Sequence, residues 1–116
     1  MANKNDDLSI VSEFLIRFYH QEPDYLEATI SALEVLRGRD RYKWELATSF
    51  THILENPLPE DGLKELVLFS ANRYVRSDEE AREVLKRIYQ DNVLDAALYF
   101  DEQTDLYKLI VHLVQT

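Results

Sequence analysis

Glycine and proline, the residues that most often interrupt helices, are scarce in this chain and stand between segments with helical periodicity. The 116 residues include two glycines and three prolines, Gly38, Gly62, Pro23, Pro57 and Pro59. The segments between them carry apolar residues three and four positions apart, which is the pattern of an amphipathic helix. The sequence therefore predicts an all-α fold, a single compact domain covering residues 1–116 with about six or seven short helices.

The first two expected helices are separated by Pro23. A helix is predicted from about Leu8 to Tyr19. Pro23 suits the first position of the helix that follows. Gly38 stands where this second helix would end in a left-handed cap. Four large apolar residues share one side of the second helix: Leu26, Ile30, Leu33 and Leu36.

Capping signals mark the next helix boundaries. Asp40 is expected to cap a third helix, which Asn56-Pro57 ends. Ser77-Asp-Glu-Glu80 has the spacing of a capping box, in which the serine hydroxyl accepts a hydrogen bond from an amide of the first helical turn. This motif is the clearest helix start in the chain.

Two apolar segments suit a strand as well as a helix. A fourth helix from Leu63 to Ala71 contains a continuous apolar run at 66–69, and a last helix from Thr104 ends in the β-branched residues of 109–114. A sixth segment is expected at 93–98 between the fifth and the last helix. Five residues on the apolar faces are expected to be buried: Phe18, Leu33, Phe50, Leu85 and Leu109.

Acidic residues outnumber basic ones by 22 to 13, which gives a net charge of −9. A field of this sign repels nucleic acid and anionic membranes and speeds the capture of a basic partner. The one basic cluster, residues 37–43, is interrupted by Asp40 and is interpreted as a solvated turn. No apolar run approaches the ~20 residues of a membrane span, and residues 1–7 do not resemble a signal peptide. We therefore expect a cytoplasmic protein that binds neither nucleic acid nor membrane.

The sequence contains no recognisable catalytic arrangement. Cysteine is absent, so neither a disulfide nor a thiol nucleophile is available. Glycine-rich phosphate loops and nucleophile-elbow serines are also missing. His20, Glu22 and Asp24 are metal-ligand types, but their spacing matches no familiar zinc signature. We expect no enzyme activity, no metal and no cofactor.

Two acidic groups that adjoin tyrosines are the candidate binding sites. Tyrosine rings supply contact area, and carboxylates direct a basic partner to them. The acidic residues at 78–83 are set apart, because carboxylates at a helix start already stabilise the helix. The candidate partner-binding residues are a first group of Glu22, Asp24, Tyr25 and Glu27, and a second group of Tyr99, Asp101, Glu102, Asp105 and Tyr107.

The segment from Phe14 to Tyr25 resembles a known protein family. Its Phe18-Tyr-His-Gln-Glu22 is similar to the Tyr-Phe-His-Gln-Asp signature of small helical immunity proteins from bacterial contact-dependent growth inhibition systems. That family places a tryptophan soon after the His-Gln pair, where this chain has Pro23 and Asp24. The resemblance implies a cytoplasmic protein that binds and neutralises a toxin domain, often a nuclease. It carries over no binding residue.

Three functions follow from these observations as alternatives. The leading interpretation is an immunity protein that occludes a cognate basic toxin domain, of nuclease type, with an acidic surface. The second is a helical adaptor or regulatory protein that binds another protein, with no toxin involved. The third is an enzyme with an unrecognised carboxylate or histidine–carboxylate metal site. The oligomeric state does not follow from the sequence.

Overall fold

The computed structural model describes residues 4–56 and 58–93. These residues form five helices and, within the described ranges, no strand. The helices are α1 (Lys4–Phe18), α2 (Tyr25–Leu36), α3 (Asp40–Glu55), α4 (Gly62–Ser70) and α5 (Asp78–Asn92). The all-α prediction is confirmed for the described residues, and the apolar run at 66–69 is helical. Six or seven helices were expected against the five described. The segment predicted at 93–98 lies outside the described residues from position 94 on, and so does the segment predicted from Thr104.

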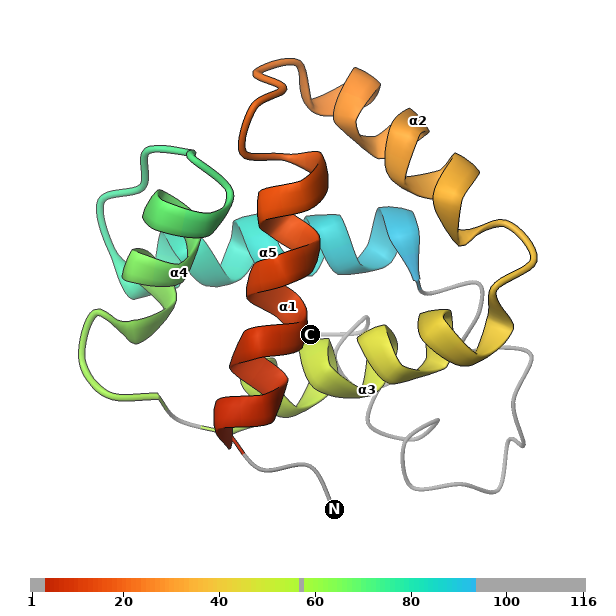
Figure 1. The fold of residues 1–116 in the computed structure, drawn as a ribbon. Helices are drawn as coiled ribbons and strands as arrows, with labels where there is room; N and C mark the ends of the chain where they lie inside the picture. Colours follow the sequence, from red (N-terminus) through yellow and green to blue (C-terminus); the bar gives the residue numbers. More distant parts are fainter. Residues whose placement is uncertain (1–3, 57, 94–116) are drawn as a thin grey trace.

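The five helices pack against one another, and α1 lies across α3 (Figure 1). α1 makes its most extensive contact with α3, and α4 makes its most extensive contact with α5. α5 also contacts α3 and α2, while α2 touches α1, α3 and α5. No helix in the described ranges is both long and apolar enough to cross a bilayer.

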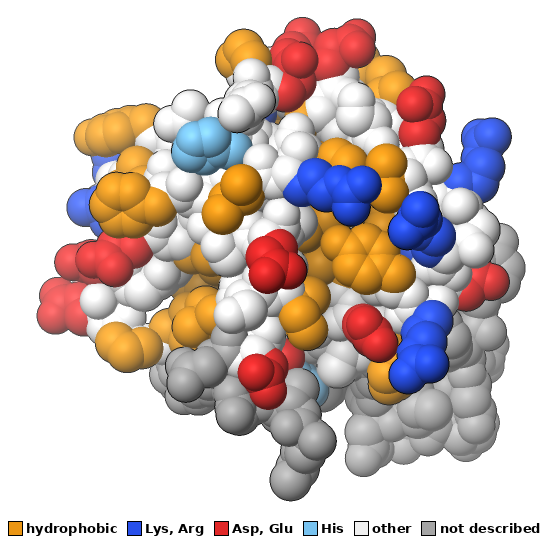
Figure 2. All heavy atoms as spheres, viewed as in Figure 1, with side chains coloured by type: hydrophobic (Ala, Val, Ile, Leu, Met, Phe, Trp, Pro, Cys, Tyr) orange, Lys and Arg blue, Asp and Glu red, His pale blue; other side chains and the backbone are white. Residues whose placement is uncertain are grey.

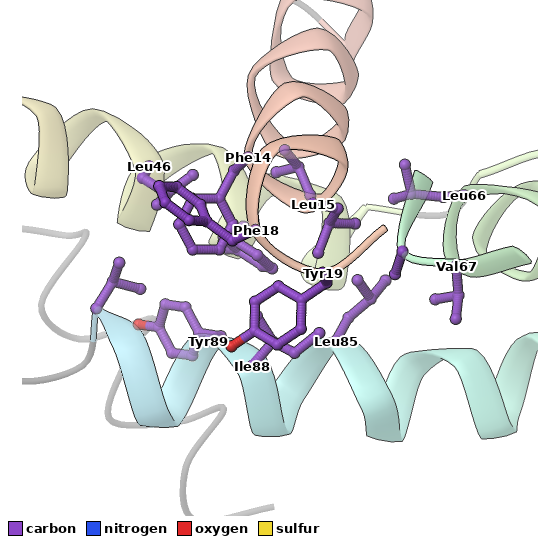
Figure 3. Close-up of a cluster of buried hydrophobic side chains, with 14 of the residues drawn as sticks. Phe14, Leu15, Phe18, Tyr19, Leu46, Leu66, Val67, Leu85, Ile88 and Tyr89 are labelled. Atoms are coloured by element: carbon purple, nitrogen blue, oxygen red, sulfur yellow. The ribbon is translucent and has the colours of Figure 1, made fainter. Parts of the chain in front are cut away.

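Aromatic side chains form the centre of the core (Figure 3). The ring centroid of Phe14 lies 5.1 Å from that of Phe18 and 6.1 Å from that of Phe50, and Phe50 in turn lies 6.0 Å from Tyr89. In Figure 3, the side chains at the end of α1 point onto Leu85, Ile88 and Tyr89 of α5.

Three of the five residues expected in the core are buried there: Phe18, Phe50 and Leu85. Leu33 is not, because 42% of its surface is exposed. That prediction is wrong, and its cause is the rotation of α2, which is explained below. Leu109 lies outside the described residues.

Side-chain caps begin α2 and α5, and two of the predicted helix starts are wrong. The hydroxyl of Ser77 accepts a hydrogen bond from the Glu80 amide at 3.1 Å, which confirms the serine cap of the predicted box. Pro23 does not open α2; the helix begins at Tyr25, and Asp24 is its N-cap. Asp40 is the first residue of α3 rather than its cap.

The end of α2 is set by local backbone conformation, whereas the start of α1 is set by contacts with another helix. Gly38 has a φ of +75°, the left-handed conformation expected of a residue that ends a helix. α1 begins at Lys4, four positions before the expected Leu8. The early start has a tertiary cause, because the buried side chain of Asp7 is hydrogen-bonded to Ser49 and His52 of α3.

Candidate protein-binding surface

The first predicted acidic group gathers at the corner between α1 and α2. The Glu22 carboxylate accepts a hydrogen bond from the Asp24 amide, and the Asp24 carboxylate accepts one from the Glu27 amide, each at 3.1 Å. We call Glu22, Asp24 and Glu27 the acidic corner. Acidic side chains are visibly grouped over this end of the molecule, at the top of Figure 2. Within the described ranges no ion pair links these three carboxylates to a lysine or an arginine.

The backbone of this corner is anchored by Arg73, a residue that no sequence pattern singled out. Its guanidinium donates to the carbonyl oxygens of Tyr19 at 2.7 Å, Ala71 at 3.0 Å and Glu22 at 2.6 Å. Carbonyl groups at the end of a helix lack partners within it, and a cation there is favourable. The positive charge of Arg73 thus binds the backbone rather than the carboxylates of the acidic corner.

Tyr25, the tyrosine of the first predicted group, is half-buried and contacts α5. Its hydroxyl donates to the Asp91 carboxylate at 2.6 Å, and the Arg87 guanidinium lies 4.2 Å from the centre of its ring. Burial raises the pKa of Tyr25 above the ordinary value, and the hydrogen bond to Asp91 raises it further. Tyr25 therefore links α2 to α5, and its use as an anchor for a partner remains a prediction.

A chain of buried hydrogen bonds fixes the inner side of α2. The Asn92 amide donates to the Tyr19 hydroxyl at 2.8 Å. The Thr29 hydroxyl donates to the Tyr25 carbonyl oxygen at 2.9 Å. The Tyr19 and Thr29 hydroxyl oxygens are 2.7 Å apart, and because the Thr29 proton is already committed, Tyr19 must be the donor between them. These hydrogen bonds run from Asn92 of α5 through Tyr19, just after α1, to Thr29 of α2, and each group donates to the next.

With Thr29 hydrogen-bonded on the inner side of α2, three large apolar residues of the helix face outward. Ala28, Thr29, Ala32 and Leu36 are buried. Leu26 is 65% exposed, and Ile30 and Leu33 are each 42% exposed. We call Leu26, Ile30 and Leu33 the α2 ridge. Of the four apolar residues expected on one side, only Leu36 is buried.

Two broad surface depressions adjoin these elements. One, of about 690 Å³, lies between α2 and α5 beside the ridge and is lined by Asp24, Tyr25, Leu26, Thr29, Arg87 and Asp91. The other, of about 570 Å³, lies between α1 and α3 and combines Trp44 with the carboxylates of Asp6, Asp7, Glu13 and Glu45. Sequence patterns could not reveal the second, because its carboxylates come from helices far apart in the chain.

The second predicted group of site residues lies outside the described residues. It consists of Tyr99, Asp101, Glu102, Asp105 and Tyr107. The described ranges contain no group of three or more potential metal ligands. His20, Glu22 and Asp24 are thus not assembled as ligands, and in the corner the two carboxylates accept hydrogen bonds from backbone amides.

The chain was compared with known protein families, curated proteins and solved structures. No family model matches the chain, and neither a curated protein nor a solved structure is significantly similar to it.

Proposed function

We propose that this chain is an immunity protein that binds and neutralises a basic toxin domain of a bacterial contact-dependent growth inhibition system. The observation that carries the proposal is the acidic corner, where three carboxylates meet at an exposed end of the molecule without a described ion pair to a cation. The net charge of −9 adds a long-range field of the same sign. The resemblance of residues 18–22 to the immunity signature supplies the biological class.

The proposed mechanism is occlusion rather than catalysis. If the toxin is a nuclease, Glu22 and Glu27 would take positions that nucleic-acid phosphates otherwise occupy and would accept paired hydrogen bonds from its arginines. The acidic field would speed the encounter, so that toxin is captured before damage accumulates. Asp24 contributes charge, but its side chain also caps α2, so it is the least suitable of the three for charge reversal.

The second candidate, an adaptor that binds another protein, is favoured by the α2 ridge. An exposed apolar row is the kind of surface that protein interfaces use at their centre. The two functions differ in how binding responds to salt. Association led by the acidic corner weakens steeply as salt rises, while association led by the ridge alone changes little.

The proposal requires a secreted protein with a variable C-terminal domain to be encoded next to this chain, and the test is a titration of the purified chain against that domain. We expect tight, salt-sensitive binding and stoichiometric loss of the toxin's activity. Glu22→Lys with Glu27→Lys should slow association and flatten the salt dependence. The matched control is Glu60→Lys with Glu83→Lys, which makes the same charge change at two exposed positions outside the corner.

Two results would reject the proposal. One is the absence of binding between the native chain and that domain, together with no protection of cells that express the toxin. The other is equal binding by the corner variant and the control variant, because that result would reduce the acidic corner to solvated surface.

A further inference from the structure

The α2 ridge is a continuous apolar row, unlike the other exposed apolar residues of the described chain. Leu26, Ile30 and Leu33 stand four and then three positions apart, so they lie along one side of α2. By contrast, Ile16 on α1 and Phe69 on α4 are exposed one to a helix. Single exposed apolar residues are ordinary on protein surfaces, whereas contiguous patches mark interaction sites.

The outward position of the ridge is held by interactions on the adjoining, inner side of the same helix. A rotation of α2 that buried the ridge would pull Thr29 away from Tyr19 and separate Tyr25 from Asp91. The small side chains of Ala28 and Ala32, both buried, let the backbone of α2 approach its neighbours on that side. The ridge is therefore a stably presented surface.

Carboxylates border the ridge and indicate which charge a binding partner should carry. Glu27 and Glu34 are both exposed, and their spacing of seven residues puts them along one edge of the row. The N-cap Asp24 is exposed at the start of the same helix, and one cation, Arg37, is exposed beyond its end. This border has a net negative charge, as does the whole chain, so the complementary surface is basic.

We propose that the α2 ridge docks against an apolar surface of a protein partner, and that lysine or arginine side chains flank this surface. The inference rests on the proposed function in taking the partner to be a basic protein, and it assigns the surface that is buried. Pairing of the ridge with a second copy of this chain is electrostatically unfavourable, because it would double the carboxylates of Glu27 and Glu34 in one interface.

The experiment uses the full chain and a synthetic amphipathic helical peptide of leucine and lysine, with the leucines on one face and lysines flanking them. Binding is followed by fluorescence anisotropy of the labelled peptide. Ile30→Gln with Leu33→Gln should weaken binding by at least about tenfold, because both residues belong to the face that the bound peptide would cover. Glutamine is a good helix former, so α2 should persist, and far-ultraviolet circular dichroism checks this.

Ile16→Gln is the matched control, because Ile16 is also an exposed isoleucine and lies in another helix. It should leave peptide binding unchanged. Glu27→Lys with Glu34→Lys should weaken binding and reduce its dependence on salt. Equal binding by the ridge variant and the Ile16→Gln control would overturn the proposal, since the peptide would then bind by general charge attraction.

Two other occupants of the ridge are separate outcomes. A native dimer in sedimentation that becomes monomeric in the ridge variant would assign the ridge to a second copy and overturn the proposal. Faster tryptic cleavage after Lys108 in the ridge variant than in the native chain would assign the ridge to the chain's own C-terminal residues, and that result would also overturn the proposal.

Titration with the toxin domain separates this inference from the proposed function. Native affinity for that domain in the ridge variant would leave the immunity role intact and reject the ridge as its surface. Absence of toxin binding by the native chain, combined with ridge-dependent peptide binding, would reject the immunity role and retain the docking surface.

Discussion

Asp7, in the first turns of α1, binds His52 of α3 through a hydrogen bond of 3.1 Å between its Oδ2 atom and the ring Nδ1 atom. The other carboxylate oxygen of Asp7 accepts a hydrogen bond from the Ser49 hydroxyl, also at 3.1 Å. Asp7 is only 4% exposed. A buried carboxylate persists when its oxygens are hydrogen-bonded, so this triad fastens the start of α1 to α3.

Asp7→Ala should lower the free energy of unfolding by about 1–3 kcal/mol, since it leaves polar groups of His52 and Ser49 without their buried partner. The measurement is urea denaturation at neutral pH. Glu13→Ala is the control, because Glu13 lies on the same helix but is exposed. Equal stability losses in the two variants would show that the contacts of Asp7 contribute nothing specific.

Phe50→Ala should cost about 3–5 kcal/mol of unfolding free energy, because it removes a fully buried ring at the centre of the aromatic core. Chemical denaturation measures the loss. Phe69→Ala deletes the same ring at a position that is 71% exposed and should change stability by less than about 0.5 kcal/mol. A loss below about 1 kcal/mol at Phe50 would contradict the described core.

Thr29→Val should destabilise the chain by about 1–3 kcal/mol although the side chain keeps its shape, because the Tyr19 hydroxyl loses its buried acceptor. Thr48→Val is a matched control. Both threonine hydroxyls donate to the carbonyl oxygen four residues earlier in their own helix, but the hydrogen bond of Thr48 is exposed, and only the Thr29 hydroxyl also accepts a hydrogen bond from Tyr19. Similar effects at the two positions would mean that the polar chain does not fix α2.

Alkaline pH should destabilise the fold through three tyrosines, of which Tyr19 and Tyr89 are buried and Tyr25 is half-buried. Burial raises the pKa of Tyr19, Tyr25 and Tyr89 in the folded chain above the ordinary value of 10.0. The unfolded chain then releases these protons at a lower pH than the folded chain. The stabilising contribution is complete below about pH 10 and is lost as the pH rises toward the folded values.

The measurement is the unfolding free energy between about pH 9 and pH 11. Tyr25→Phe should flatten the decline, because it removes one titrating hydroxyl. Tyr74→Phe, at a highly exposed position, should leave the slope unchanged. A native stability that stays constant across this range would contradict the raised pKa values.

Features that depend on neighbouring residues were predictable from the sequence alone. The Ser77 cap and the left-handed Gly38 follow from local backbone chemistry, so their positions could be derived before any packing was known. The gathering of Glu22, Asp24 and Glu27 was predictable for the same reason, because the first and the last are only five positions apart. The helical periodicity likewise grouped Leu26, Ile30 and Leu33 on one side of α2, but it wrongly added Leu36, which is buried.

Which way that row faces was decided only by the tertiary structure. Periodicity shows that apolar residues share a side of a helix, but it contains no information about which side meets the rest of the fold. The inner side of α2 meets Tyr19 through Thr29, ten residues further along, and that tyrosine is fixed by Asn92, 73 residues after it. Arg73, which holds the acidic corner, is similarly 51 residues from Glu22. The sequence thus determined the helices and their sides, while hydrogen bonds between distant residues determined which side of α2 is exposed, because a buried polar group must find its partner wherever the fold places one.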